Sequence, residues 1–300
     1  MPALGNIELR HLSEQHLRDT YRNIIAQGKI ATAVELSKDI GQMLRWAEKR
    51  KPWRALLIDG NPSELVDVDN LVPKDYTKAR TRQLSVEEII KLKTLYDASN
   101  QSNTPVLKQE AQIATWLCLG TLCRIGELLM IEWRHVDLAK GTWFIPAANT
   151  KGERGKKCEQ LIYLSDFTLA QFKQLHALTG DSAWAFPARF NDGHVCTKTV
   201  SKQIGDRQIQ FKQRTRKLQG RSESNALVLG EQEWTPHDLR RTGATMMQKL
   251  KISREVINLC QNHVIGSKVD RVYLLDDYAD EKREAWDKLG KRLEAILATA

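Results

Sequence analysis

The stretch EAQIATWLCLGTLCRIGELLM, residues 110–130, is the part of the chain with the strongest pattern of a buried helix. Its apolar stretch from Ile113 to Cys123 stops at Arg124. That run is far shorter than the roughly 20 residues a membrane-spanning helix needs. We therefore expect one buried helix that carries Arg124 and Glu127 near its end, in a globular domain.

Short strands follow this helix. The segments GTWFIP from Gly141 and QLIYL from Gln160 are typical of strands, and residues 149–159 between them are rich in glycine and charge. They predict a hairpin with a basic tip. Further helical patterns cover 167–178, 198–216, 240–250, 254–260 and 279–297. The predicted fold class is mainly α with a small antiparallel β-sheet (α+β).

The first part of the chain predicts a separate helical module. Apolar residues recur there near the helical period, and turn-forming and basic residues follow it. Ser85 with Glu88 three residues later has the pattern of a capping box, which begins a new helix. We therefore expect a helical domain at 1–72, a basic linker at 73–82 and a larger domain at 83–300.

Composition narrows the class of protein. The 300 residues are 41% apolar and 28% charged, which favours a folded core over disorder or a fibrous repeat. The start of the chain lacks the pattern of a secretory signal. Five scattered cysteines form no zinc-binding spacing and are interpreted as reduced thiols, so we expect a cytoplasmic protein and no metal site.

Charge favours a polyanionic partner. Lys and Arg number 46 against 37 Asp and Glu, so the formal net charge is 46 − 37 = +9. Basic side chains that face phosphates gain affinity by displacing counterions. Residues 198–221 are strongly basic with Asp206 as their single acid, and a solvated face is the alternative interpretation. The predicted DNA contacts are Lys198, Lys202, Arg207, Lys212, Arg214, Arg216 and Lys217, with Lys78, Arg80 and Arg82 from the linker.

Five motifs occur in one order along the larger domain. They are CRIGE at 123–127, Lys151 in the hairpin, WAFP at 184–187, TPHDLRRT at 235–242, and Asn262-His263 followed by Tyr273. Each alone has an ordinary explanation, such as an ion pair, a helix cap or a solvated lysine. Their joint order and spacing resemble the tyrosine recombinases of the phage integrase family over nearly the whole chain.

This resemblance implies a small core-DNA-binding domain and a catalytic domain with a C-terminal exchange helix. It implies a site-specific recombinase that cleaves and rejoins DNA through a 3′-phosphotyrosine, as a tetramer on two double-stranded recombination sites. The chain is most similar to integrases of phages or genomic islands, which integrate or excise mobile elements. The expected setting is the bacterial cytoplasm and nucleoid, with an accessory DNA-bending or directionality factor as a further partner. No metal or nucleotide cofactor is expected, because a phosphotyrosine conserves the energy of the phosphodiester bond.

The chemistry explains the residue types. Attack of a phenol on a phosphodiester places growing negative charge on two non-bridging oxygens, and guanidinium offers a permanently charged planar fork for them. A phenol with an ordinary pKa of about 10 needs help to lose its proton. By resemblance, the predicted site comprises Arg124 and Arg240 as phosphate clamps, Tyr273 as nucleophile, His237 as its assistant, Lys151 as general acid, His263 as a phosphate donor and Glu127 as a support for the cations.

Several alternatives stay open. Tyr278 competes with Tyr273 for the role of nucleophile, and Tyr163 is interpreted as a packing residue. Trp286 lies on the predicted C-terminal helix. Two interpretations of this helix are equally favoured: it docks on a neighbouring protomer, or it docks on its own domain. Integrases of the resembled subtype carry a further amino-terminal domain for arm sites, and nothing before residue 7 fits one, so we expect a shorter recombinase or a piece of a longer chain. A type IB topoisomerase and a catalytically silent DNA-binding protein are the rival functions.

Overall fold

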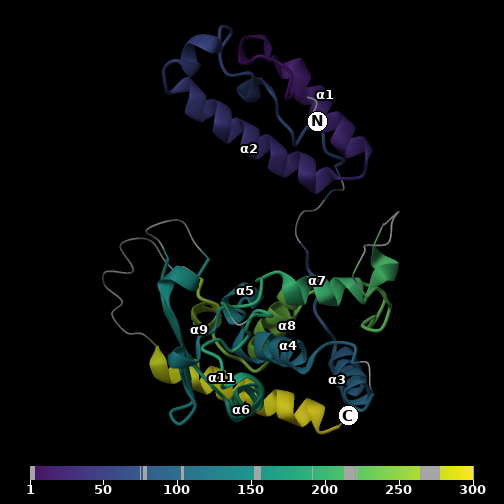
Figure 1. Ribbon diagram of the computed structural model, residues 1–300, viewed down its shortest axis with the longest axis vertical. Coiled ribbons are helices and arrows are strands. Elements are labelled where there is room, and N and C mark those ends of the chain that lie inside the picture. The colour runs from purple at the N-terminus through teal and green to yellow at the C-terminus, as the bar shows by residue number, and fades with distance from the viewer. Residues whose placement is uncertain are drawn as a thin grey trace. The chain divides into compact units, whose positions relative to one another are not determined.

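The computed structural model describes residues 4–299 except 75, 77–79, 103–104, 152–156, 191, 213–219, 221 and 264–277. The chain divides into two compact units, Met1–Arg80 and Thr81–Ala300, and Figure 1 colours both by residue number. Each unit has its own hydrophobic core. Within the described part of the chain, none of the helices combines the length and apolar character needed to cross a bilayer.

The first unit is built on two helices, α1 (Glu14–Ala26) and α2 (Ile30–Glu48). Short 3-10 helices at Leu9–His11, Trp53–Leu56 and Pro62–Leu65 accompany them. Leu17 and Tyr21 of α1 and Leu44 of α2 are fully buried at the interface of the two helices. These positions recur with the helical period, so one face of each helix packs on the other. The helical character predicted for this part of the chain is confirmed.

The second unit is helical with one small sheet, which confirms the predicted fold class. Its described helices are α3 (Val86–Asn100), α4 (Gln109–Thr121), α5 (Ile125–Leu128), α6 (Asp166–Thr179), α7 (Thr199–Asp206), α8 (Pro236–Lys249), α9 (Arg254–Cys260) and α11 (Ala279–Leu297). Shorter 3-10 helices lie at Trp133–His135, Ala147–Asn149 and Ile209–Phe211. The predicted capping box begins α3, because the Ser85 hydroxyl accepts from the Glu88 amide and the Glu88 carboxylate accepts from the Ser85 amide.

The sheet holds β1 (Val136–Asp137), β2 (Thr142–Ile145) and β3 (Gln160–Tyr163) in that order, all antiparallel. Trp143 of β2 pairs with Ile162 of β3, and both are buried. The two predicted strands are therefore present and form a hairpin. Most of the tip that joins them, residues 152–156, lies outside the described residues.

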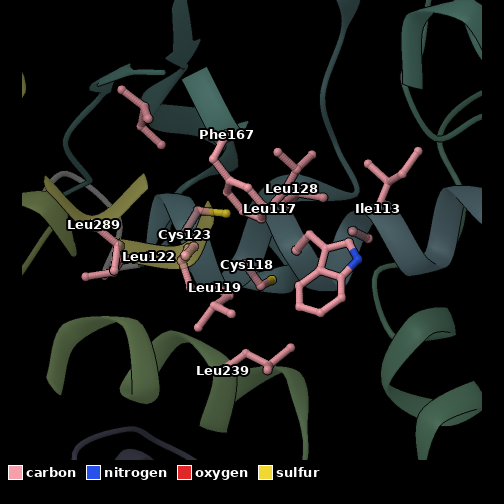
Figure 2. Packing of buried hydrophobic residues seen from close by; sticks show 14 of the residues in the cluster. Ile113, Leu117, Cys118, Leu119, Leu122, Cys123, Leu128, Phe167, Leu239 and Leu289 are labelled. Atoms are coloured by element: carbon pink, nitrogen blue, oxygen red, sulfur yellow. The ribbon is translucent and has the colours of Figure 1, made fainter. Parts of the chain in front are cut away.

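Helix α4 is the centre of the larger core. Every residue from Ala111 to Thr121 is buried, so α4 must be covered on all sides. Helices α8, α6, α5 and α11 pack against it. Figure 2 shows Leu117 and Leu119 of α4 among Phe167 of α6, Leu239 of α8 and Leu289 of α11. Segments far apart in the sequence are thus drawn together around one apolar helix.

The prediction of a single helix over 110–130 is wrong in its second half. Helix α4 ends at Thr121, Leu122 adopts a left-handed conformation with φ 60°, and Arg124 is the N-cap of α5. The Glu127 carboxylate accepts a hydrogen bond from the Arg124 amide and so begins a new helix. Apolar residues continue up to Cys123, and the left-handed position is a leucine, while the nearby Gly120 and Gly126 lie within α4 and α5. For that reason hydrophobic periodicity gave no sign of it.

Two other predicted helices have different limits. The helix expected over 198–216 ends at Asp206. Helix α8 begins at Pro236, ahead of the periodic pattern over 240–250, because proline occupies its first turn and Thr235 caps it with Asp238; His237 to Arg240 thus open a helix after Thr235-Pro236, as the sequence predicts.

Helix α11 docks on its own unit. The side chain of Trp286 is buried, and its indole nitrogen donates to the Thr121 carbonyl at 3.0 Å. That carbonyl stands at the end of α4, where no further helical partner remains for it. Figure 1 shows α11 crossing the unit beside α6 and α9. Of the two interpretations of Trp286, the structure shows docking on its own domain.

The close crossing of α8 over α4 gives the first prediction. A Cβ on Gly243 would overlap the Leu119 carbonyl oxygen, whereas a Cβ on Gly193 would meet nothing within 4 Å. Gly243→Ala should lower the free energy of unfolding by about 1–3 kcal/mol, because overpacking forces the backbones apart. Gly193→Ala, a matched control, should change it little. Thermal unfolding of the two variants measures this, and equal stability would contradict the account.

Candidate active site

Arg124 stands in front of α5 and is held by a buried carboxylate. Its Nη1 donates to Glu127 Oε1 at 2.7 Å, and its backbone amide donates to Glu127 Oε2 at 3.0 Å. The Glu127 side chain is only 3% exposed, while that of Arg124 is 25% exposed. The carboxylate therefore fixes the guanidinium from the inner side and leaves part of it open to solvent. The predicted support role of Glu127 has this geometric basis.

Arg240 lies in the second turn of α8 and is 2% exposed. Its Nη1 donates to the Leu122 carbonyl, and its Nη2 donates to the Gln261 carbonyl at 2.5 Å. The Nη2 atom also lies 3.2 Å from His263 Nε2. Arg240 thus joins the turn before α5 to the turn after α9, and its partners are neutral groups.

Burial, followed by the charge of Arg124, lowers the pKa of Arg240 to about 10. The guanidinium therefore still carries its charge at neutral pH. The charge of Glu127 acts in the opposite direction. Arg124, Arg240 and Glu127 consequently share one electrostatic environment in which positive charge exceeds negative charge.

The two predicted site histidines belong to the same environment. Burial lowers the pKa of His237, and the charges of Arg241 and Arg240 lower it further. Burial also lowers the pKa of His263, and Arg240 and Arg124 add to that effect. Both imidazoles are therefore neutral at pH 7, and a neutral imidazole has one nitrogen without a proton. In His263 that nitrogen is Nε2, because it lies against Arg240 Nη2 and a guanidinium only donates.

A cleft of about 760 Å³ opens beside these groups. Its lining includes both histidines and three arginines, and none of the described residues that line it is acidic. The lining residues are His237, Arg240, Arg241, Ala244, Thr245, Gln248, Ile252, Arg254, Ile257, Gln261 and His263. Such a surface favours an anionic ligand.

Lys151 is exposed and directly follows the buried Thr150 at the end of the β2 arm of the hairpin. Between Lys151 and the other described site residues the structure shows no hydrogen bond or ion pair. Tyr273 lies outside the described residues.

The two other tyrosines considered from the sequence are both described. Tyr278 is the N-cap of α11, and its hydroxyl donates to Glu255 Oε1 at 3.3 Å. Tyr163 packs against Trp286 with ring centroids 6.2 Å apart, and the Arg283 guanidinium lies 4.5 Å above its ring. Tyr163 is therefore a packing residue, as interpreted from the sequence.

Among the predicted DNA contacts that are described, Lys198, Lys202 and Arg80 have exposed side chains. Three less exposed residues bond to other groups of the protein: Arg82 to Glu88, Lys212 to Glu233, and Arg207 to the carbonyls of Val106 and Gln203. These three residues have fewer donors left for a phosphate. Lys78, Arg214, Arg216 and Lys217 lie outside the described residues.

Sequence reasoning missed several groups of the site. The carbonyls of Leu122 and Gln261 hold Arg240, and a backbone acceptor leaves no mark on the sequence. Arg241 lines the cleft and donates to the fully buried Asp238 at 2.6 Å. The Asp238 position could have been found, because Thr235 followed three residues later by an acid is a capping-box pattern.

Solved structures resemble the chain at low sequence identity. A lambda integrase fragment, solved as a dimer bound to a COC' core site, matches with a TM-score of 0.61 and 16% identity, over 88% of this chain and 83% of that one. A lambda integrase tetramer bound to a Holliday junction gives 0.60 and 16%, over 90% and 66%. The integrase of the transposon Tn1549, in complex with transposon right end DNA, gives 0.57 and 11%, over 90% and 86%.

These structural matches establish the fold. No curated protein matches the sequence. The phage integrase family, however, matches residues 87–279, which covers more than half of the chain. The chain therefore belongs to the phage integrase family, and its larger unit has the fold of a tyrosine recombinase catalytic domain.

Proposed function

We propose that this protein is a site-specific DNA recombinase that cleaves and rejoins strands through a 3′-phosphotyrosine at Tyr273. The observation that carries the proposal is the pair of fixed arginines, Arg124 and Arg240, in one electrostatic environment. Arg240 is buried and bonded to neutral acceptors, so its charge is left for an anion. A phosphate that gains charge in a transition state fits this arrangement.

In the proposed reaction, the Tyr273 hydroxyl oxygen attacks the phosphorus atom and the bond to the 5′ oxygen breaks. The phenol proton passes to a neutral imidazole, for which His237 is the candidate, and Lys151 gives a proton to the departing 5′ oxygen. Arg124, Arg240 and His263 donate to the non-bridging oxygens. Attack by a 5′ hydroxyl on the phosphotyrosine reverses the same steps and rejoins a strand.

We further propose that the chain acts on double-stranded recombination sites as a tetramer and integrates or excises a mobile element. Membership of the phage integrase family supports this role. The similarity to a lambda integrase tetramer on a Holliday junction and to a transposon integrase on transposon end DNA supports it further. The helical unit at the amino terminus is proposed as the core-DNA-binding module, and the exposed Lys198 and Lys202 as phosphate contacts.

A nicked suicide substrate tests the nucleophile. Wild-type protein should trap a covalent protein–DNA adduct, because the short strand released by cleavage diffuses away. Tyr273→Phe should abolish the adduct, and Tyr278→Phe, its matched control, should retain it. The adduct is measured on a denaturing gel. An adduct with Tyr273→Phe would contradict the assignment, and wild-type protein that binds DNA without an adduct would indicate a silent binding protein.

The arginine pair gives a second prediction. Arg124→Ala should lower the cleavage rate by about 100-fold or more, because one donor to the transition state is lost. Arg240→Lys should lower it comparably, since an ammonium cannot reproduce the planar fork. Arg134→Ala, a change at a mostly exposed arginine paired with Glu132, is the control. DNA affinity should stay nearly unchanged in all three variants, and parallel losses of affinity and rate would assign the arginines a structural role.

The lowered histidine pKa values predict the pH profile. Because a depressed pKa keeps His237 neutral, the second-order cleavage rate should stay level as pH falls through the ordinary histidine value of about 6.5 and decline only below it. Arg241→Gln removes a charge that lowers the pKa of His237, so the decline should move to higher pH. Single-turnover rates at limiting DNA measure both profiles. A decline centred at or above 6.5 in wild-type protein would refute the neutral imidazole.

A further inference from the structure

We propose that Gln160 and Asn262 are positioning residues that fasten the hairpin carrying Lys151 to the turn carrying His263. We call these two residues the latch. The proposal rests on the proposed function, because it concerns delivery of the general acid. It gives a role to two residues whose side chains donate to backbone carbonyls of the described chain.

Gln160 supplies one half of the latch. It begins β3 and is 8% exposed. Its side-chain amide nitrogen, Nε2, donates to the Cys260 carbonyl at 2.8 Å and to the Leu259 carbonyl at 3.3 Å. The Cys260 carbonyl ends α9, where the last carbonyls of a helix lack further helical donors, and the Leu259 carbonyl also accepts from the Asn262 backbone amide. A strand of the hairpin therefore caps the helix that leads into the site.

Asn262 supplies the other half, in the reverse direction. Its backbone is left-handed with φ 50°, a conformation that asparagine tolerates better than most residues. The side-chain amide nitrogen of Asn262, Nδ2, donates to the carbonyl of Cys158, which lies on the β3 arm of the hairpin, at 3.2 Å. The residue before Asn262 accepts from Arg240, and the residue after it is His263. The latch thus ends directly on the cationic site.

The other arm of the hairpin is anchored as well. Lys157 donates to the Ala148 carbonyl at 3.0 Å across the hairpin, and Asn149 donates to the Met130 carbonyl at 3.5 Å. Thr150 is buried, and its hydroxyl donates to the Ala147 carbonyl at 2.9 Å. Lys151 therefore extends from a base that is fixed on both sides. If the latch opens, the base can shift relative to Arg240 and His263, and the reach of the lysine ammonium changes with it.

The nature of the leaving group separates this role from a general structural one. An ordinary substrate releases a 5′ oxygen, which needs a proton as the phosphorus–oxygen bond breaks. A substrate with sulfur at the bridging 5′ position releases a thiolate, which is stable without a proton. Loss of general-acid delivery should therefore slow cleavage of the oxygen substrate and spare the sulfur substrate.

The test compares two latch variants on both substrates. Asn262→Gly keeps a residue suited to positive φ and removes the amide donor. Gln160→Met keeps the side-chain length and removes the donor to α9. Each should slow single-turnover cleavage of the oxygen substrate by about tenfold, as expected for a misplaced catalytic group, and change the sulfur substrate by less than about twofold. Leu161→Ala, a change at the exposed neighbour on β3, is the control and should leave both rates unaltered.

Lys151→Met provides the reference. If sulfur rescues Lys151→Met and not the latch variants, or if the latch variants cleave both substrates at the wild-type rate, the latch is overturned and the proposed function stands. If sulfur fails to rescue Lys151→Met, or wild-type protein forms no adduct, the proposed function fails. Hydrogen exchange of residues 157–163 needs no DNA: the latch requires faster exchange in Asn262→Gly, and unchanged exchange overturns it in every case.

Discussion

The site depends on the burial of one guanidinium. Arg240 is charged and almost completely enclosed, and such a group is stable only where its donors find acceptors. The acceptors are carbonyls from the turn before α5 and the turn after α9. Both carbonyls stand where a helix has ended, so they need donors as much as the arginine needs acceptors. A single side chain thereby brings two distant segments together and keeps a positive charge available between them.

The core around α4 makes this arrangement possible. Because α4 is buried on every side, α8 packs tightly on it, and Gly243, one turn beyond Arg240, lies at the close crossing. The left-handed Leu122 then turns the chain so that its carbonyl faces Arg240 and Arg124 begins α5. The packing of α8 on α4 fixes the position of Arg240 on α8. Arg240 in turn contacts His263, with its Nη2 3.2 Å from His263 Nε2. The hydrogen bonds of Gln160 and Asn262 extend the same organisation to the hairpin.

Much of this was predictable from residues with local signals. The apolar periodicity of α11 and the Ser85 capping box gave an accurate helix and an accurate helix start. The resemblance carried by CRIGE and TPHDLRRT singled out Arg124 and Arg240, and the structure places these two arginines in one electrostatic environment. The break at Leu122 was not predictable, because the left-handed residue is an ordinary leucine inside an apolar run. Neither were the acceptors of Arg240, since they are backbone atoms whose availability is decided by where helices end. The hydrogen bonds of Arg207 to the Val106 and Gln203 carbonyls were missed for a similar reason. A count of charged residues does not reveal which of them bond to other groups of the same protein.

The central claim is that Arg124 and Arg240 act on one phosphate together with Tyr273. The most direct measurement is an experimental structure of the Tyr273→Phe protein bound to a DNA recombination site. The account predicts both guanidinium groups within hydrogen-bond distance of the non-bridging oxygens of a single phosphate, with the ring of residue 273 facing the same phosphorus atom. Arginines that contact different phosphates, or an Arg240 that contacts only protein carbonyls when DNA is bound, would contradict it.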